Sequence, residues 1–445
     1  MRLHNSDTRH SITGVREATD LVVAVDVGSA RVASIVAEIG HERPLILAAE
    51  SVASFGIRGG EIVDIKRASE AIRISIVAAA DRAETDVKTV VVGLSGDVKQ
   101  SHAKAAMDLD RERRLVTAAD VSRLRGCLSH EAGSGRRVVH RFDGPYSVGD
   151  LHGVEHPEGM SGERLEMHAS FLSAPGDRID NLLAAVRGAG VEIEAVVLEP
   201  MACSFGALSR DERALGAAVL DLGAGGFRGA LWEGGRLRQI HIVPREGHVS
   251  QSGSGRAVPG TVPAINGMDG VVMALARRFR IAPATAERLL RSHGALGESE
   301  LAAIPEYAEV AAVDGLGSIH VGTLELSRTL EELMIPVARS LREGLSGFSA
   351  GHTVGVVLTG GGARIKGMPA WISKRFAGAP VRLGVPNWNM ANALVAPPET
   401  EGCSGCSLAG LVALGAEGRM QMRNRRNHSF FGRLGDNLRR FAASL

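Results

Sequence analysis

The sequence predicts an α/β protein with a duplicated core, because one strand pattern occurs in it twice. In each copy an apolar strand ends in Asp, and a glycine turn, a returning strand, a second turn and a third strand follow. The first copy covers residues 21–52 with Asp26 at the end of its first strand, and the second covers residues 217–243 with Asp221 at that place. Apolar runs rich in β-branched residues are typical of buried strands. The repeat therefore predicts two similar sheets in one chain.

The other elements follow from the period of the apolar residues and from the turn residues between them. Strands are predicted at residues 21–26, 31–39, 45–52, 89–94, 191–198, 217–221, 227–232, 237–243, 354–358 and 381–383. Helices are predicted at residues 64–84, 177–190, 271–293, 327–345, 368–376 and 407–417. Residues 129–162 are polar and rich in His, and residues 251–270 are rich in Gly, Ser and Pro. We predict a solvated loop for the His-rich region 129–168 and an inserted loop or linker for residues 251–270.

Composition excludes several classes of protein. The chain has 445 residues, of which 44% are hydrophobic and 23% charged, and its net charge is +1. That balance is typical of a globular protein and argues against a surface that binds nucleic acid. No run of about 18 apolar residues occurs, so we expect no membrane-spanning helix. The N-terminal residues 1–20 are polar and lack the apolar region of a signal peptide, which indicates a loose tail.

Cysteine and histidine give weak signals for metal. Four Cys fit a reducing compartment. Cys403 and Cys406 form a lone C-x-x-C, whereas a structural zinc site needs four ligands, so we favour an ordinary glycine-rich loop over a metal or redox site. Five scattered histidines are predicted to lie in solvated loop: His130, His140, His152, His156 and His168.

The duplicated turns carry residues suited to phosphate. Backbone N–H groups that glycine leaves accessible can bind phosphate oxygens, and an Asp at a strand end can hold Mg²⁺ directly or through water. The predicted phosphate and metal residues of the first turn are Asp26, Gly28, Ser29 and Arg31, and those of the second are Asp221, Gly223 and Gly225. A dinucleotide-binding turn is disfavoured because a strand, not a helix, follows these glycines. The alternative is that the duplicated turns are only tight hairpins of a core sheet and bind no ligand.

A third glycine turn, made by Gly360, Gly361 and Gly362, follows the strand at residues 354–358 and precedes a helix. Helix N-termini favour anions, and a backbone without side chains lets a flat base lie close. The segment is not a P-loop, because Lys366 is followed by Gly367 rather than by Ser or Thr.

Two phosphate hairpins followed by a late glycine turn resemble the actin/Hsp70/sugar-kinase superfamily. More narrowly, the chain resembles the FtsA family of bacterial cell-division actin homologues. The stretches that carry this resemblance are RGGEIVD at 58–64, VVGLSG at 91–96, MSGERLE at 160–166, VLEPMA at 197–202, VVLTGGG at 356–362 and GVP at 384–386. The resemblance implies an actin-like, ribonuclease H-like two-lobed fold that binds ATP and Mg²⁺. It implies that Glu199 lies near the attacking water, that Glu287 touches ribose or adenine, and that the third glycine turn contacts adenosine.

The resemblance also implies how the chain is divided. Lobe 1A would comprise residues 21–86, 176–212 and 395–417, with the inserted SHS2-like subdomain 1C at 87–175. Lobe 2A would comprise residues 213–246 and 323–394, and subdomain 2B residues 247–322 with the insertion 251–270. A linker at 418–428 would join a terminal helix at 429–445. The partners implied are the tubulin-like division protein FtsZ, further copies of this chain in a polymer, and other division proteins. A pilus-assembly relative and a small-molecule kinase of the superfamily are the alternatives.

The second hairpin departs from the family pattern. The family usually has Gly-Gly-Gly-Thr-Thr-Asp after the second Asp, whereas this chain has GAGGFR at residues 223–228. Two hydroxyls and an acid are thereby replaced by Gly226, Phe227 and Arg228. In the first hairpin Ser29 and Arg31 stand where Thr and Lys are usual. We therefore expect ATP binding with weak or no hydrolysis.

The last residues predict an amphipathic helix. Ser429 is a suitable N-cap, and the apolar residues after it recur at spacings of three and four while Arg residues lie off their stripe. Such a helix is typical of a peripheral anchor on anionic lipid, and packing on the core or on a protein partner are the alternatives. The family resemblance implies that this lipid is the cytoplasmic face of the inner membrane at the septum. The predicted membrane-binding residues are Phe430, Phe431, Arg433, Leu434, Leu438, Arg439, Arg440 and Phe441.

Overall fold

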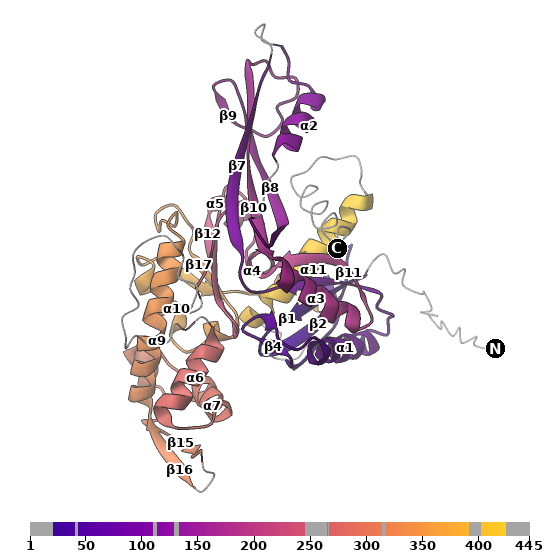
Figure 1. The fold of residues 1–445 in the computed structure, drawn as a ribbon. Coiled ribbons are helices and arrows are strands. Elements are labelled where there is room, and N and C mark those ends of the chain that lie inside the picture. Colours follow the sequence, from indigo (N-terminus) through magenta and orange to yellow (C-terminus); the bar gives the residue numbers. More distant parts are fainter. Residues whose placement is uncertain are drawn as a thin grey trace, which may run out of the picture.

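The computed structural model describes residues 21–40, 43–109, 114–128, 133–244, 265, 267–313, 317–390 and 402–423. The N-terminal tail, most of the insertion 251–270 and the predicted amphipathic helix lie outside these residues. Two lobes lie side by side, and a long, narrow sheet projects from one of them (Figure 1).

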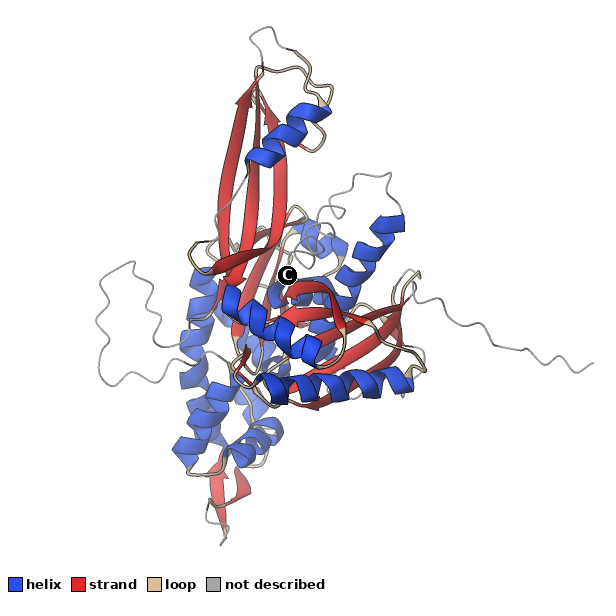
Figure 2. Cartoon of the chain, turned by 45° about the vertical axis from the view of Figure 1, so that its right-hand side comes forward, coloured by secondary structure: helices blue, strands red, loops and turns tan. Residues whose placement is uncertain are grey.

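The first lobe is built on a mixed sheet with the order β11-β6-β1-β2-β3-β19. Its strands are β1 (Leu21–Val27), β2 (Arg31–Glu38), β3 (Leu45–Ala53), β6 (Thr89–Leu94), β11 (Glu192–Leu198) and β19 (Asn389–Met390). Two helices, α1 (Ile65–Arg82) and α3 (Gly176–Gly188), lie together on one face (Figure 2). The helices α4 (Glu199–Ala207) and α11 (Cys406–Arg423) pack on the other face. A small hairpin, β4 (Ile57–Arg58) with β5 (Glu61–Ile62), precedes α1.

The second lobe repeats the first in strand order. Its sheet has the order β14-β13-β12-β17-β18. The strands are β12 (Ala217–Leu222), β13 (Phe227–Glu233), β14 (Arg236–Ile242), β17 (Val356–Thr359) and β18 (Val381–Leu383). In both lobes the first three strands are antiparallel and the next two run parallel to the first. The predicted duplication therefore extends beyond the hairpins to five strands of each sheet.

The projecting sheet has four strands in the order β7-β10-β8-β9. Its elements are β7 (Lys99–Asp108), α2 (Ala118–Cys127), β8 (Arg136–Val148), β9 (Leu151–Val154) and β10 (Arg164–Pro175). The prediction of a solvated loop at residues 129–168 is wrong, because β8, β9 and the start of β10 lie in that region and β8 pairs along β10. Most residues of β8 are only partly buried and its buried residues do not alternate regularly, so the polar sequence gives no clear strand pattern. Its His140 is buried. His152 and His168 are exposed but lie in β9 and β10 rather than in a loop, His156 is exposed, and His130 lies outside the described residues.

Helices dominate the remainder of the second lobe. They are α5 (Arg210–Leu215), α6 (Met268–Phe279), α7 (Pro283–His293), α8 (Glu298–Leu301), α9 (Thr323–Gly344) and α10 (Met368–Arg375), and a hairpin of β15 (Tyr307–Ala311) and β16 (Ser318–Gly322) lies beyond them. The predicted single helix at 271–293 is two helices. The backbone of Arg280 is left-handed, and Pro283, which lacks an N–H, starts the second helix.

Three predicted boundaries also move. Helix α6 starts at Met268, so the final residues of the predicted insertion 251–270 are helical. Helix α9 begins at Thr323, four residues before the predicted start, and continues through Pro336. Helix α11 continues to Arg423 into the predicted linker at 418–428, and the Arg419 guanidinium pairs there with the Glu194 carboxylate of β11.

Helices α4 and α11 cross at very short range. A Cβ on Gly206 would lie 1.8 Å from the Cys406 carbonyl oxygen, and one on Gly410 would lie 1.7 Å from that of Ala202. Only glycine permits this approach, so these two residues fix α4 against α11. Because α4 begins at Glu199, the crossing also fixes that carboxylate.

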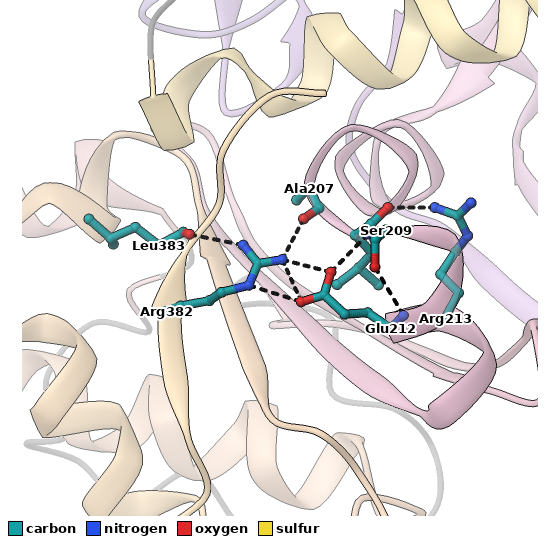
Figure 3. A network of polar contacts seen from close by, with 7 residues as sticks. Ala207, Ser209, Glu212, Arg213, Arg382 and Leu383 are labelled. Carbon is teal, nitrogen blue, oxygen red and sulfur yellow. Dashed lines mark hydrogen bonds and ion pairs between the residues drawn. The ribbon is translucent and has the colours of Figure 1, made fainter. Parts of the chain in front are cut away.

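An arginine network joins the second sheet to the segment between the lobes (Figure 3). The Arg382 guanidinium of β18 donates to both carboxylate oxygens of Glu212 at 2.7 and 2.8 Å and to the Ala207 carbonyl oxygen at 2.9 Å. This network lies away from the cavity described next, whose lining does not include Arg382.

Candidate nucleotide site

One cavity of about 460 Å³ lies between the two lobes. That volume is within the usual range of small-ligand sites, roughly 300–1,000 Å³. All twelve residues predicted for nucleotide, metal or catalysis line it: Asp26, Gly28, Ser29, Arg31, Glu199, Asp221, Gly223, Gly225, Glu287, Gly360, Gly361 and Gly362. The structure thus brings together residues that are up to 336 positions apart in the sequence (Asp26 to Gly362). Their individual roles remain predictions.

The two duplicated turns touch each other at one end of the cavity. A Cβ on Gly225 would lie 2.2 Å from the Ser29 Oγ and 2.7 Å from the Gly60 backbone nitrogen. The Ser29 hydroxyl accepts a hydrogen bond from that same nitrogen at 2.6 Å. Glycine at 225 is therefore required for the close contact of the turns, and Ser29 holds the small hairpin before α1 against them.

The third glycine turn forms another wall. Gly360 has φ +82°, in the left-handed region, and a Cβ there would lie 2.6 Å from an Asp221 carboxylate oxygen. A Cβ on Gly362 would meet the Met268 sulfur of α6 at 2.8 Å, whereas one on Gly361 would meet nothing within 4 Å. Glu287 of α7 lies on this side and pairs with Arg291 at 2.6 Å.

The structure adds one residue that the sequence analysis did not place in the site. Arg228, on β13, is 4% exposed, and its side chain lies among the carboxylates of the cavity. Its Nη1 lies 2.6 Å from the Asp221 carboxylate and its Nη2 lies 2.8 Å from the Glu199 carboxylate. The sequence does contain a signal for this residue. Arg228 stands between Phe227 and Gly229 in an apolar strand, and an arginine in a buried strand needs a carboxylate or another hydrogen-bond acceptor as its partner.

Both acids bound by Arg228 have further partners. The Ser95 hydroxyl donates to the same Glu199 oxygen at 2.6 Å, and the Thr359 hydroxyl donates to the other Asp221 oxygen at 3.2 Å. Glu199 and Asp221 are 8% and 6% exposed. The carboxylate of Glu199, which was predicted to be catalytic, is therefore bound through one oxygen by a cation and a hydroxyl. That oxygen does not face open space in the cavity.

Burial sets the electrostatics of the centre. Burial raises the pKa of Asp26 to about 7, and the nearby Glu199 charge adds to the shift. Burial also raises the pKa of Asp221, against the opposing effect of Arg228. Burial disfavours the charged form of Arg228, but Glu199 and Asp221 outweigh that effect and raise the pKa of its guanidinium. The arginine is thus a permanent cation among three carboxyl groups.

The projecting sheet supports the backbone next to Glu199. The Leu198 N–H donates to the His140 Nε2 at 3.0 Å, and Leu198 is the N-cap of α4. Burial lowers the pKa of His140 to about 3, so the ring is neutral and Nε2 is available as an acceptor. A histidine predicted to be solvated is therefore a structural residue near the cavity.

The loop predicted around Cys403 and Cys406 is instead a short 3-10 turn, Gly402–Gly405, followed directly by α11. Cys403 and Cys406 are buried, and both are free thiols. The Cys403 Sγ lies 3.6 Å from the Gly360 carbonyl oxygen, so it packs under the third glycine turn. Within the described ranges, no three His, Cys, Asp or Glu side chains form a cluster that could hold a metal ion.

The cavity fits a nucleotide but not the metal that usually accompanies it. Three turns offer glycine backbone, and Arg31, Arg364 and Lys366 line the cavity as possible partners of phosphate. Mg²⁺ needs carboxylate or water oxygens in near-octahedral geometry. The oxygens of Asp221 and Glu199 that face each other across the lobes are bound instead by Arg228.

Comparison with known proteins decides the family. The model described as "Cell division protein FtsA" matches residues 218–409, and the model described as "SHS2 domain inserted in FTSA" matches residues 96–173. The chain belongs to the FtsA family of cell-division proteins. The SHS2 match falls on the projecting sheet and lies within the predicted insertion at 87–175.

FtsA proteins from distant bacteria align along most of the chain. The FtsA of Escherichia coli K12 is 28% identical over 390 residues, which cover 83% of this chain and 86% of that protein. The FtsA of Streptococcus pneumoniae serotype 2 is 27% identical over 371 residues, which cover 82% and 75%.

Solved structures confirm the actin-like fold. The PilM–PilN type IV pilus biogenesis complex matches with a TM-score of 0.57 at 16% identity, covering 89% of this chain and 98% of that one. MreB5 of Spiroplasma citri bound to ADP matches with a TM-score of 0.51 at 13% identity, covering 91% and 99%. These likenesses show the fold alone.

Proposed function

We propose that this FtsA-family chain binds ATP between its lobes, self-associates, and tethers the FtsZ ring to the cytoplasmic face of the inner membrane through its C-terminal helix. The observation that carries the nucleotide part is the cavity in which all three glycine turns and both strand-end Asp residues converge. An actin-like relative in this fold, MreB5, is described as bound to ADP. Turnover is weak or absent, because Glu199 and Asp221 are occupied by Arg228.

The membrane part rests on the sequence of residues 429–445, which lie outside the described structure. Phe431, Leu434, Leu438 and Phe441 form one stripe, and Arg433, Arg439 and Arg440 lie beside it. The stripe enters the acyl boundary while the arginines meet anionic headgroups, each contributing about 1 kcal/mol near the surface. Among the described residues, no helix has the length and hydropathy to cross a bilayer.

Co-sedimentation with lipid vesicles tests this anchor. Phe431→Glu places a charge in the acyl boundary and removes apolar area, so binding to anionic vesicles should fall by at least about tenfold. Phe55→Glu is the matched control, because Phe55 is an exposed phenylalanine of the body, 51% accessible, and binding should be unchanged. Undiminished binding of Phe431→Glu, or equal binding of the unaltered chain to neutral and anionic vesicles, would contradict the anchor.

The FtsZ contact is proposed from the family alone, on subdomain 2B at residues 247–322. Deleting residues 251–264, which precede α6, and replacing the α6 and α7 arginines Arg277, Arg278 and Arg291 by Ala should weaken pull-down of FtsZ. Unchanged recovery of FtsZ by this variant would contradict the placement on 2B.

A further inference from the structure

One buried cation connects the two halves of the cavity. Arg228 belongs to the second sheet, and it binds Asp221 of the same sheet and Glu199 at the start of α4, which follows the first sheet directly. All three residues are less than 9% exposed. A charge pair this deeply buried persists only when its partners are fixed and hydrogen-bonded, and both acids here have hydroxyl donors as well.

The Arg228 guanidinium occupies the position at which a divalent cation would neutralise the neighbouring carboxylates best. The carboxylates of Asp26, Glu199 and Asp221 line one cavity with the phosphate-type turns, and three such groups together repel one another unless a cation lies among them. In this chain the guanidinium is that cation. A second cation within a few ångströms of it would be repelled, and would find the facing oxygens of Glu199 and Asp221 already engaged.

We propose that Arg228 is a built-in cation that takes the place of the divalent metal, so that this chain binds ATP without Mg²⁺. The inference rests on the nucleotide binding proposed above and specifies the form of ATP that the site accepts, which is the metal-free triphosphate.

The chemistry of the side chain supports this role. A guanidinium is planar and carries several N–H donors in a fixed fork, and the pairs with Glu199 and Asp221 leave further donors for phosphate oxygens. Arginine–phosphate hydrogen bonds are charge-assisted and strong. Arg31, Arg364 and Lys366 line the same cavity and add to the positive charge that a metal-free triphosphate requires.

The decisive experiment is calorimetric titration of the full chain with ATP, once in excess EDTA and once in millimolar MgCl₂. We expect binding in EDTA that is at least as tight as in MgCl₂. Binding that appears only in MgCl₂, or that is more than about tenfold tighter there, would overturn the inference while leaving the proposed nucleotide binding intact. Absence of ATP binding in both buffers would overturn the nucleotide function itself, and the inference with it.

Variants identify the residue responsible. Arg228→Met keeps a long side chain without the charge, so ATP affinity in EDTA should fall by about tenfold or more and should be partly restored by MgCl₂. Arg228→Lys keeps a cation and should retain part of the affinity in EDTA. Arg382→Met is the matched control, because it removes an arginine from another Arg–Glu pair outside the cavity and should leave both affinities unchanged.

A second readout needs no nucleotide and covers the case of a poorly folded variant. Thermal unfolding of the unaltered chain should not respond to MgCl₂ alone, whereas that of Arg228→Met should shift upward, because the Glu199 and Asp221 carboxylates then lack their cation. Circular dichroism at low temperature shows whether the variant is folded. An upward shift of the unaltered chain as large as that of the variant would contradict the inference.

Discussion

The two duplicated hairpins share their strand register and differ in the residue that lies opposite the strand-end Asp. In the first, Asp26 of β1 pairs in register with Ala33 of β2. In the second, Asp221 of β12 pairs in register with Arg228 of β13, at the same spacing of seven residues. The position opposite the strand-end Asp is therefore a small apolar residue in one copy and a buried cation in the other.

The difference shows that strand register alone does not determine what a duplicated turn can bind. Asp26 has no arginine in register opposite it, and burial raises its pKa to about 7 although Arg31 at the start of β2 acts to lower it. Asp221 keeps a guanidinium at 2.6 Å, and that guanidinium also reaches the other lobe. One hairpin thus has an acid opposite an alanine, while the other supplies an internal ion pair that joins the lobes.

The largest expected effect is on the second hairpin. Arg228→Met leaves two buried carboxylates without their cation, and the free energy of unfolding should fall by about 3–5 kcal/mol. Arg382→Met breaks a partly exposed pair, with side chains 41% and 25% accessible, and should cost only about 1 kcal/mol. Urea titration of both variants in EDTA measures the two losses. Equal losses of unfolding free energy would contradict this prediction, because the buried ion pairs of Arg228 would then be no more stabilising than the Arg382–Glu212 pair outside the cavity.

The first hairpin should respond in the opposite direction. The pKa of Asp26 is raised on folding from 3.8 to about 7, so its contribution to stability is present below pH 3.8 and is lost as the pH rises through 7. Asn does not ionise, so Asp26→Asn does not lose this stability as the pH rises. The free energy of unfolding of the variant should exceed that of the unaltered chain by roughly 2–4 kcal/mol at pH 8 but by little near pH 4. Urea unfolding across this range tests it, and a gain independent of pH would contradict the assignment.

A smaller effect is expected where the projecting sheet supports Glu199. Folding lowers the pKa of His140 from 6.5 to about 3, so the stability it contributes is present above pH 6.5 and is lost as the pH falls. Between pH 6.5 and pH 5 the unaltered chain should lose about 2 kcal/mol more than His140→Gln, which keeps an acceptor for the Leu198 N–H but does not titrate. Parallel slopes in that range would show that His140 titrates normally.

Local patterns predicted the fold better than they predicted the site. Both hairpins and the glycine turns follow from apolar runs and turn residues, and β18 has the predicted bounds. The strand β8 was missed because one face of the projecting sheet is polar, so its sequence lacks a continuous apolar run. The break before Pro283 was missed because the apolar period continues across it.

The chemistry of the site depends on contacts that no local pattern contains. Arg228 meets Glu199 across 29 residues, and His140 meets Leu198 across 58. The sequence marked residues 226–228 as a departure from the family but could not show that the new arginine turns inward. Only the register of β12 and β13 together with the crossing of α4 and α11 brings the three charges together.

The most direct test of the account is the dependence of ATP affinity on the concentration of Mg²⁺. If Arg228 takes the place of the metal, the affinity of the unaltered chain follows the concentration of metal-free ATP and does not improve at any concentration of Mg²⁺. For Arg228→Met the affinity should instead rise as Mg²⁺ is added. An affinity of the unaltered chain that rises in proportion to the Mg–ATP complex would contradict the account.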